Sequence, residues 1–138
     1  MKELLQRSFP FWDGLSREQQ KAMDQGITKT YCEKKTRLHF GGGECAGVQI
    51  IEKGRARIFI TSPNGGDITL FRLMDGDVSI LRAACMLNGM DIELDMEMET
   101  DCTVYTIPKR VYKKLYDESG AVKDYTMEMI SEKFSDIM

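Results

Sequence analysis

The sequence contains a single histidine, His39. One histidine cannot form a two-histidine metal centre, so we expect neither a metal nor a catalytic residue in this chain. The chain also lacks a nucleophile elbow, a phosphate-loop lysine motif and a dinucleotide fingerprint. The glycine run at 41–43 precedes a predicted strand rather than a helix, so we interpret it as a turn. These absences indicate a binding protein rather than an enzyme.

Long apolar segments are missing as well. No stretch approaches the roughly 20 apolar residues that a membrane-spanning helix needs, and residues 1–7 lack the apolar core of a signal peptide. We expect a cytoplasmic protein without membrane contact, whose four cysteines are reduced thiols.

Basic residues are not in excess, since the formal net charge is −3 at pH 7. Proteins that bind nucleic acid directly usually carry a basic face that displaces counterions from phosphates. We therefore do not expect this chain itself to bind DNA. Its 138 residues, of which 42% are hydrophobic, suit one compact domain.

The four cysteines form no Cys-x-x-Cys pair, so a structural zinc or a metal cluster has little support. Cys32 and Cys102 fall in predicted strands, and we expect them to be small buried hydrophobic residues. Cys45 and Cys85 fall in glycine- or alanine-rich turns between strands. A thiol-based redox sensor that uses Cys45 and Cys85 is therefore an alternative function.

Short runs of β-forming residues recur along the chain, at 27–32, 48–52, 56–61, 67–73, 92–98 and 103–107. Turn signals separate them at 41–43, 53–54, 63–66 and 75–77. Many short strands at intervals of about 8–12 residues are typical of a sandwich or roll. The clearest hairpin turn is Pro63-Asn64-Gly65-Gly66, because asparagine and glycine tolerate a positive φ. We therefore predict a mainly β fold.

Residues 91–99 alternate acidic and apolar side chains at a period of two. In a strand, this pattern places Ile92, Leu94, Met96 and Met98 on one face and every carboxylate on the other. Two interpretations remain open: a core face backed by a solvated acidic face, or an acidic patch for a cation or a basic partner.

The N-terminal region predicts a helix that begins after Ser16. Ser16 and Gln19 form a capping-box pattern, and the helix should run to about Gln25 with Gly26 as its C-cap. Near the other end, Pro108 is expected to open a second, short helix, which the pair at 119–120 breaks.

A longer helix is predicted over 121–138, because this segment contains neither proline nor glycine. Met127, Ile130, Phe134 and Ile137 follow a three-four-three spacing, which is typical of the seam of a helix that packs on a partner. We expect a homodimer held by this seam. Because the seam is still running at residue 138, we also expect the chain to be part of a longer protein.

Three motifs follow one another in the middle of the chain: IIEKGRAR at 50–57, DITLFRL at 67–73 and DGD at 75–77. With the helical arm before them and the long helix after them, they resemble the effector domain of the Crp/Fnr family of transcription regulators. The resemblance implies a double-stranded β-helix, that is, a jelly-roll or cupin-like β-roll with N-terminal helices and a C-terminal dimerisation helix. Residues 1–118 would form this cyclic-nucleotide-binding-like sensor domain with its helical arm, and residues 119–138 would begin the dimerisation helix.

The function implied by the resemblance is that of an effector-sensing and dimerisation domain, without catalysis, of a DNA-binding transcription regulator. DNA would be read by a C-terminal helix-turn-helix domain that this chain does not contain. The expected ligand-binding residues are Gly76, Asp77, Ser79, Arg82, Ala83 and Ala84.

The ligand cassette departs from the pattern of cyclic-nucleotide binders. Leu81 stands about where the family's ribose-binding glutamate would lie, and Asp91 or Ile92 falls near the position of its phosphate-binding arginine. We expect no tight binding of cyclic AMP, and the effector stays unknown. A cupin-like metal enzyme is a less favoured alternative, because its ligands would have to come from inward carboxylates of 91–99, against their alternation.

Overall fold

The computed structural model describes residues 2–40, 47–79 and 94–137 of the chain. The first helical elements are α1 (Lys2–Ser8), the short 3-10 helix η1 (Trp12–Gly14) and α2 (Arg17–Gly26). The strands are β1 (Thr28–Cys32), β2 (Arg37–Phe40), β3 (Gly47–Lys53), β4 (Ala56–Thr61), β5 (Asp67–Leu73), β6 (Leu94–Met98) and β7 (Cys102–Pro108). The last elements are α4 (Lys109–Glu118) and α5 (Gly120–Ile137).

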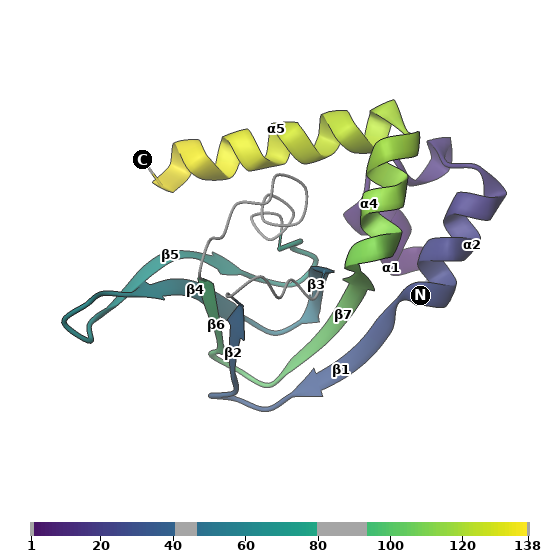
Figure 1. The fold of residues 1–138 in the computed structure, drawn as a ribbon. Coiled ribbons are helices and arrows are strands. Elements are labelled where there is room, and N and C mark those ends of the chain that lie inside the picture. Colours follow the sequence, from purple (N-terminus) through teal and green to yellow (C-terminus); the bar gives the residue numbers. More distant parts are fainter. Residues whose placement is uncertain (1, 41–46, 80–93, 138) are drawn as a thin grey trace.

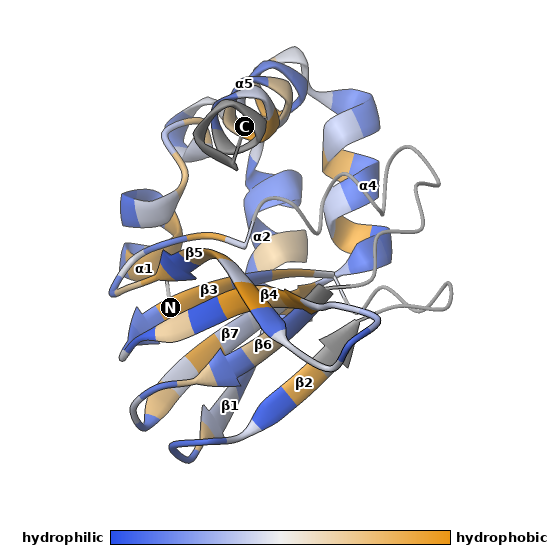
Figure 2. Ribbon diagram, turned by 90° about the vertical axis from the view of Figure 1, so that its left-hand side faces the viewer, coloured by the Kyte–Doolittle hydropathy of each residue, from blue (hydrophilic) through white to orange (hydrophobic). Residues whose placement is uncertain are grey.

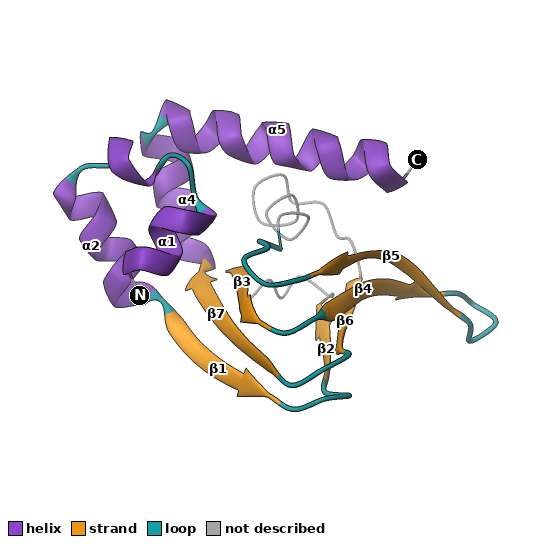
Figure 3. Cartoon of the chain, turned by 180° about the vertical axis from the view of Figure 1, so that it is seen from behind, coloured by secondary structure: helices purple, strands orange, loops and turns teal. Residues whose placement is uncertain are grey.

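The strands form two antiparallel sheets, one in the order β1-β7-β3 and the other in the order β2-β6-β4-β5. Helices α1, α2 and α4 gather beside one end of the three-stranded sheet, and α5 extends from α4 back above the strands (Figures 1 and 3). The architecture is a mainly β jelly roll with helices at both ends of the chain, which confirms the predicted fold class.

The predicted strands agree closely with the structure. β4 and β5 have the expected bounds, and β1, β3 and β7 differ from expectation by one residue at one or both ends. Residues 92 and 93 of the predicted sixth strand lie outside the described residues. The sequence does not predict β2, because four residues before a glycine run are too few to show a periodicity. The turn at 63–66 joins β4 to β5 as predicted, with Gly65 at a φ of 85°.

Helix α2 begins with the predicted capping box. The Gln19 N–H donates to the Ser16 hydroxyl (3.2 Å), and the Ser16 N–H donates to the Gln19 side-chain oxygen (2.9 Å). The prediction of Gly26 as the C-cap is wrong: Gly26 is the last helical residue, and the cap is Ile27 in an extended conformation. Because the buried Ile27 leads directly into β1, no left-handed turn is needed there.

Gly26 has a packing role instead. A Cβ atom at this position would lie 3.0 Å from Cγ2 of Val111, so the absence of a side chain allows α4 to approach α2 closely. Helix α4 itself begins after Pro108 and ends at Glu118, before the predicted break at Ser119, and it buries Tyr112 and Leu115.

The hydrophobic residues form two cores, one on each side of the three-stranded sheet. The first lies between this sheet and the helices and includes Val48 and Ile50 of β3. The second lies inside the roll, between the two sheets, and includes Ile51 of β3. Both faces of this sheet therefore carry apolar side chains, and hydrophobic residues recur along the strands in Figure 2.

Candidate functional site

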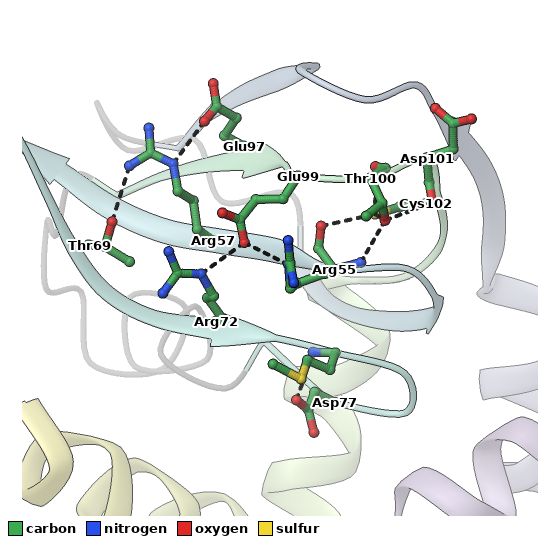
Figure 4. Close-up of polar contacts among 11 residues, drawn as sticks. Arg55, Arg57, Thr69, Arg72, Asp77, Glu97, Glu99, Thr100, Asp101 and Cys102 are labelled. Carbon is green, nitrogen blue, oxygen red and sulfur yellow. Dashed lines mark hydrogen bonds and ion pairs between the residues drawn. The ribbon is translucent and has the colours of Figure 1, made fainter.

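The turn at 75–77 is built by hydrogen bonds within the chain. Gly76 adopts a φ of 88°, which a residue with a side chain rarely adopts, and its N–H donates to the carbonyl of Ile51 (2.6 Å). The Asp77 carboxylate accepts a 2.8 Å hydrogen bond from the Met74 N–H and so closes the turn from within (Figure 4). Gly76 and Asp77, which we predict to line the effector pocket, thus have a clear role in shaping the turn.

The residues after this turn form a short extension of the three-stranded sheet. The N–H of Ser79 donates to the carbonyl of Gln49 (2.7 Å), the N–H of Ile51 donates to the carbonyl of Asp77 (3.0 Å), and Val78 pairs with Ile50. Ser79 is buried at this point. The other predicted ligand-binding residues, Arg82, Ala83 and Ala84, lie outside the described residues. The predicted ligand site therefore stays a prediction.

Gln49 is a buried polar residue that belongs to no recognisable sequence motif. Its side chain is only 3% exposed, and its Oε1 atom has no hydrogen-bond partner among the described residues. Val48 and Ile50 on either side pack under the helices, so Gln49 shares with Ile51 the face that looks into the roll. The available signal was a lone glutamine within the apolar run at 48–51.

The outer face of the four-stranded sheet carries a network of arginine–carboxylate pairs. Arg57 donates from Nε to Glu97 (2.8 Å) and from a terminal nitrogen to Asp67 (3.1 Å), and Arg37 reaches Glu97 as well (2.9 Å). The two guanidinium groups lie over the ring of Phe59, with centroid distances of 4.1 and 5.2 Å. They cover this otherwise outward-facing ring, which is 1% exposed.

Glu99 occupies the second centre of the network, between Arg72 (2.9 Å) and Arg55 (3.0 Å), as Figure 4 shows. The hydrogen bonds from Arg57 and Arg72 hold the pKa values of Glu97 and Glu99, respectively, below the ordinary value of a glutamate. Met96 and Met98 alternate with these carboxylates and are fully buried in the roll, as the first interpretation of this strand predicts. The acidic face, however, is neither freely solvated nor open to a partner at Glu97 and Glu99. Arg57 and Arg37 neutralise Glu97, and Arg72 and Arg55 neutralise Glu99.

Cys32 and Cys102 are buried free thiols, as predicted. They lie opposite each other in the register of β1 and β7. Burial raises the pKa of the Cys32 thiol, and the neighbouring Cys102 raises it further. Cys45 and Cys85, the predicted redox pair, lie outside the described residues.

Helix α5 packs on the body of the chain through one face. Ile130 of the predicted dimer seam is buried in the core beneath the helices, whereas Met127 is 45% exposed. The side chains of Phe134 and Ile137 lie outside the described part of the structure. Met127 is thus accessible at the surface, and the seam stays a prediction.

Two further properties concern the described residues only. No three histidine, cysteine, aspartate or glutamate side chains among them gather in a way that could hold a metal ion. No helix in this part of the chain is long and apolar enough to cross a membrane.

Comparisons with known proteins agree with this fold. The cyclic nucleotide-binding domain family matches residues 29–119. A solved protein from Eubacterium rectale, described as a transcriptional regulator of the Crp/Fnr family, shares 34% sequence identity with the chain at a TM-score of 0.87; the match covers 95% of this chain and 61% of that one. The chain therefore spans less than two thirds of the length of this relative. A search of curated protein sequences finds no significant match.

More distant structures share the fold alone. The sensor domain of the transcriptional regulator DNR from Pseudomonas aeruginosa has 15% identity and a TM-score of 0.77, over 96% of this chain and 87% of that one. The regulatory domain of Toxoplasma gondii protein kinase A, solved with cyclic AMP, has 19% identity and a TM-score of 0.74. The match covers 95% of this chain and 48% of that one.

The matched residues run from the second residue of β1 to the end of α4. The chain belongs to the cyclic nucleotide-binding domain family.

Proposed function

We propose that this chain is the effector-sensing and dimerisation domain of a Crp/Fnr-type transcription regulator, and that it has no catalytic activity of its own. The observation that carries the proposal is the 34% identity to the Eubacterium rectale regulator over 95% of the chain. DNA binding would belong to a part of the regulator that this chain does not contain. Residues 1–118 would sense the effector, and residues 119–138 would begin the dimer contact.

The proposed effector site lies in the roll, next to the turn that carries Gly76 and Asp77. Ser79 continues from this turn beside β3, and Arg82, Ala83 and Ala84 follow in the sequence. In the sequence, Leu81 stands about where a ribose-binding glutamate would lie, and Asp91 or Ile92 falls near the position of a phosphate-binding arginine. We therefore propose an effector other than cyclic AMP.

The proposed output is a change in the position of α5. Tyr112 of α4 hydrogen-bonds Thr126 of α5 in the buried angle between the two helices, so a shift of α4 is transmitted to α5. A ligand that binds one arrangement of these helices more tightly would favour the corresponding dimer geometry. Met127 would then change its contacts across the homodimer, whereas Ile130 would follow the shift from within the core.

The test is a thermal-shift measurement with cyclic AMP, cyclic GMP, haem and a panel of metabolites. A ligand at 100 times its Kd should stabilise the fold by about 2.7 kcal/mol. A shift with a compound other than a cyclic nucleotide supports the proposal. A large shift with cyclic AMP contradicts the proposed specificity, and no shift with any compound favours the alternative of a redox sensor at Cys45 and Cys85.

Dimerisation is tested separately, by sedimentation of the wild-type chain and of Met127→Glu. A charge at this exposed position should dissociate a dimer without disturbing the core, because Met127 makes no part of it. A chain that is monomeric at all concentrations would contradict the proposed role of α5 within these residues.

A further inference from the structure

A row of uncharged polar side chains crosses the face of the three-stranded sheet that looks into the roll. Thr28 pairs with Thr106, and Thr106 pairs with Gln49. Ser79 lies on the other side of Gln49, because its N–H bonds the Gln49 carbonyl and its neighbour Val78 pairs with Ile50. Directly opposed residues of antiparallel strands project to the same face, so the four side chains lie side by side.

The row passes from the surface into the interior. Thr28 is exposed, Thr106 is half-buried, and Gln49 and Ser79 are buried at 3% and 2% exposure. Most of their neighbours on the same face of these strands are apolar: Cys32, Ile51, Cys102 and Val104 belong to the core inside the roll, whereas Thr30 of the edge strand β1 is exposed. A polar row deep in an apolar roll requires a reason, because a buried polar group without a partner destabilises the fold.

Gln49 holds the unsatisfied group of the row. Its Oε1 is buried and accepts no hydrogen bond from any described residue. By contrast, the side chain of Gln20 donates from Nε2 to the carbonyl of Trp12 at 2.9 Å. An amide oxygen held inside the roll without a donor is complementary to a molecule that brings one.

We propose that Gln49 is a specificity-determining contact of the effector site, and that its Oε1 accepts a hydrogen bond from an uncharged N–H or O–H group of the effector. The inference rests on the proposed effector-sensing function and adds the chemistry of the ligand. Because the row contains no charged side chain, the part of the effector that lies here is neutral, such as a carboxamide, an exocyclic amine or a hydroxyl. Ser79 and Thr106 flank this group with hydroxyls that can donate or accept.

The first measurement uses the chain without ligand. Gln49→Met keeps the length of the side chain and removes the unsatisfied oxygen, so Tm should rise by roughly 2–8 °C. Gln20→Met is the matched control: it removes a glutamine whose amide is bonded, so its Tm should fall. If Gln49→Met lowers Tm as the control does, Gln49 is an ordinary structural residue and the inference is overturned.

The second measurement is binding, with nicotinamide, adenosine and cyclic AMP as donor-bearing probes and N,N-dimethylnicotinamide as a probe without a donor. A donor-bearing probe that binds the wild-type chain should bind Gln49→Met about 10-fold more weakly and Gln20→Met unchanged. The wild-type chain should also bind nicotinamide more tightly than the dimethyl derivative, whereas Gln49→Met should bind the two equally. Equal binding to Gln49→Met and wild type overturns this inference alone, whereas no binding by any probe or metabolite to the wild type removes the effector site itself.

Discussion

Nε of Arg57 lies 2.8 Å from Oε1 of Glu97, across the pair formed by β4 and β6, and the guanidinium plane rests on the ring of Phe59. One arginine thus neutralises a carboxylate and covers a buried aromatic ring. The side chain of Arg57 is 14% exposed, which is far less than the 48% of Arg72 in the same network. The two arginines should therefore contribute differently to the free energy of unfolding.

Arg57→Met should lower the free energy of unfolding by about 1–3 kcal/mol, because it leaves Glu97 and Asp67 without their nearest cation. Arg72→Met is the matched control on the neighbouring strand. It should lower the free energy of unfolding by less than about 1 kcal/mol, because water screens the exposed ion pair with Glu99. Urea unfolding followed by circular dichroism measures both. Equal losses would mean that the cover over Phe59 contributes nothing.

The same network makes stability depend on acidity. The pKa values of Glu97 and Glu99 lie below the ordinary 4.5 because arginines hydrogen-bond their ionised forms. The unfolded state therefore binds these protons first, and the stabilisation is complete above about pH 5 and is lost as the pH falls through the lowered pKa values. Glu97→Gln should be less stable than the wild type at pH 7, and the difference should shrink toward pH 3. A constant difference across this range would contradict the assignment.

A second pair, Tyr112 and Thr126, joins α4 to α5. The Thr126 hydroxyl donates to the carbonyl of Val122 (2.7 Å), so the Tyr112 hydroxyl is the donor in the 2.5 Å bond between the two side chains. Burial raises the pKa of Tyr112, which means that the protonated phenol is the form the fold requires. Stability from this group is present below the ordinary pKa of 10 and is lost as the pH rises above it.

Thr126→Val should cost about 1–3 kcal/mol of unfolding free energy, because the buried Tyr112 hydroxyl loses its acceptor. Tyr112→Phe combined with Thr126→Val should cost less than the sum of the two single changes, since the double variant leaves no orphaned donor. Chemical unfolding of the four proteins gives the coupling directly. If the losses of unfolding free energy are additive, the two hydroxyls do not interact. The Tyr112–Thr126 hydrogen bond would then not couple α4 to α5.

The sequence predicts the features that depend on local periodicity. The alternation at 91–99 correctly identifies the buried face of Met96 and Met98, and the Ser16–Gln19 pattern correctly identifies the start of α2. The sequence does not predict which residues pair across strands. Arg37 and Glu97 are 60 residues apart in the sequence, and only the register of β2 on β6 brings them together. A strand pattern shows which side chains share a face but not which strand lies next to it.

The same limit applies to the site. A single glutamine in an apolar strand is visible at Gln49, but its unsatisfied oxygen is recognised only once Thr106 and Ser79 are placed beside it. The C-cap prediction at Gly26 fails for a related reason, because the close approach of Val111 is a tertiary contact.

The last prediction concerns the reactivity of Cys32 and Cys102. Both thiols are buried, and burial raises the pKa of Cys32. The Cys102 thiol also contacts the carbonyls of Thr100 (3.3 Å) and Arg55 (3.5 Å). Both should react with an aryl disulfide reagent at least about 10-fold more slowly in the folded chain than in urea, as measured by mass spectrometry of the labelled peptides.

Tyr31→Cys is the matched control for this measurement, because position 31 is 67% exposed and adjoins Cys32 on the opposite face of β1. The introduced thiol should be labelled quickly in the folded state. If Cys32 and Cys102 are labelled as fast as this control, the opposed pair on β1 and β7 becomes the thiol switch. If they are protected, a redox function of this chain must rest on Cys45 and Cys85, and replacing those two with serine becomes the decisive experiment.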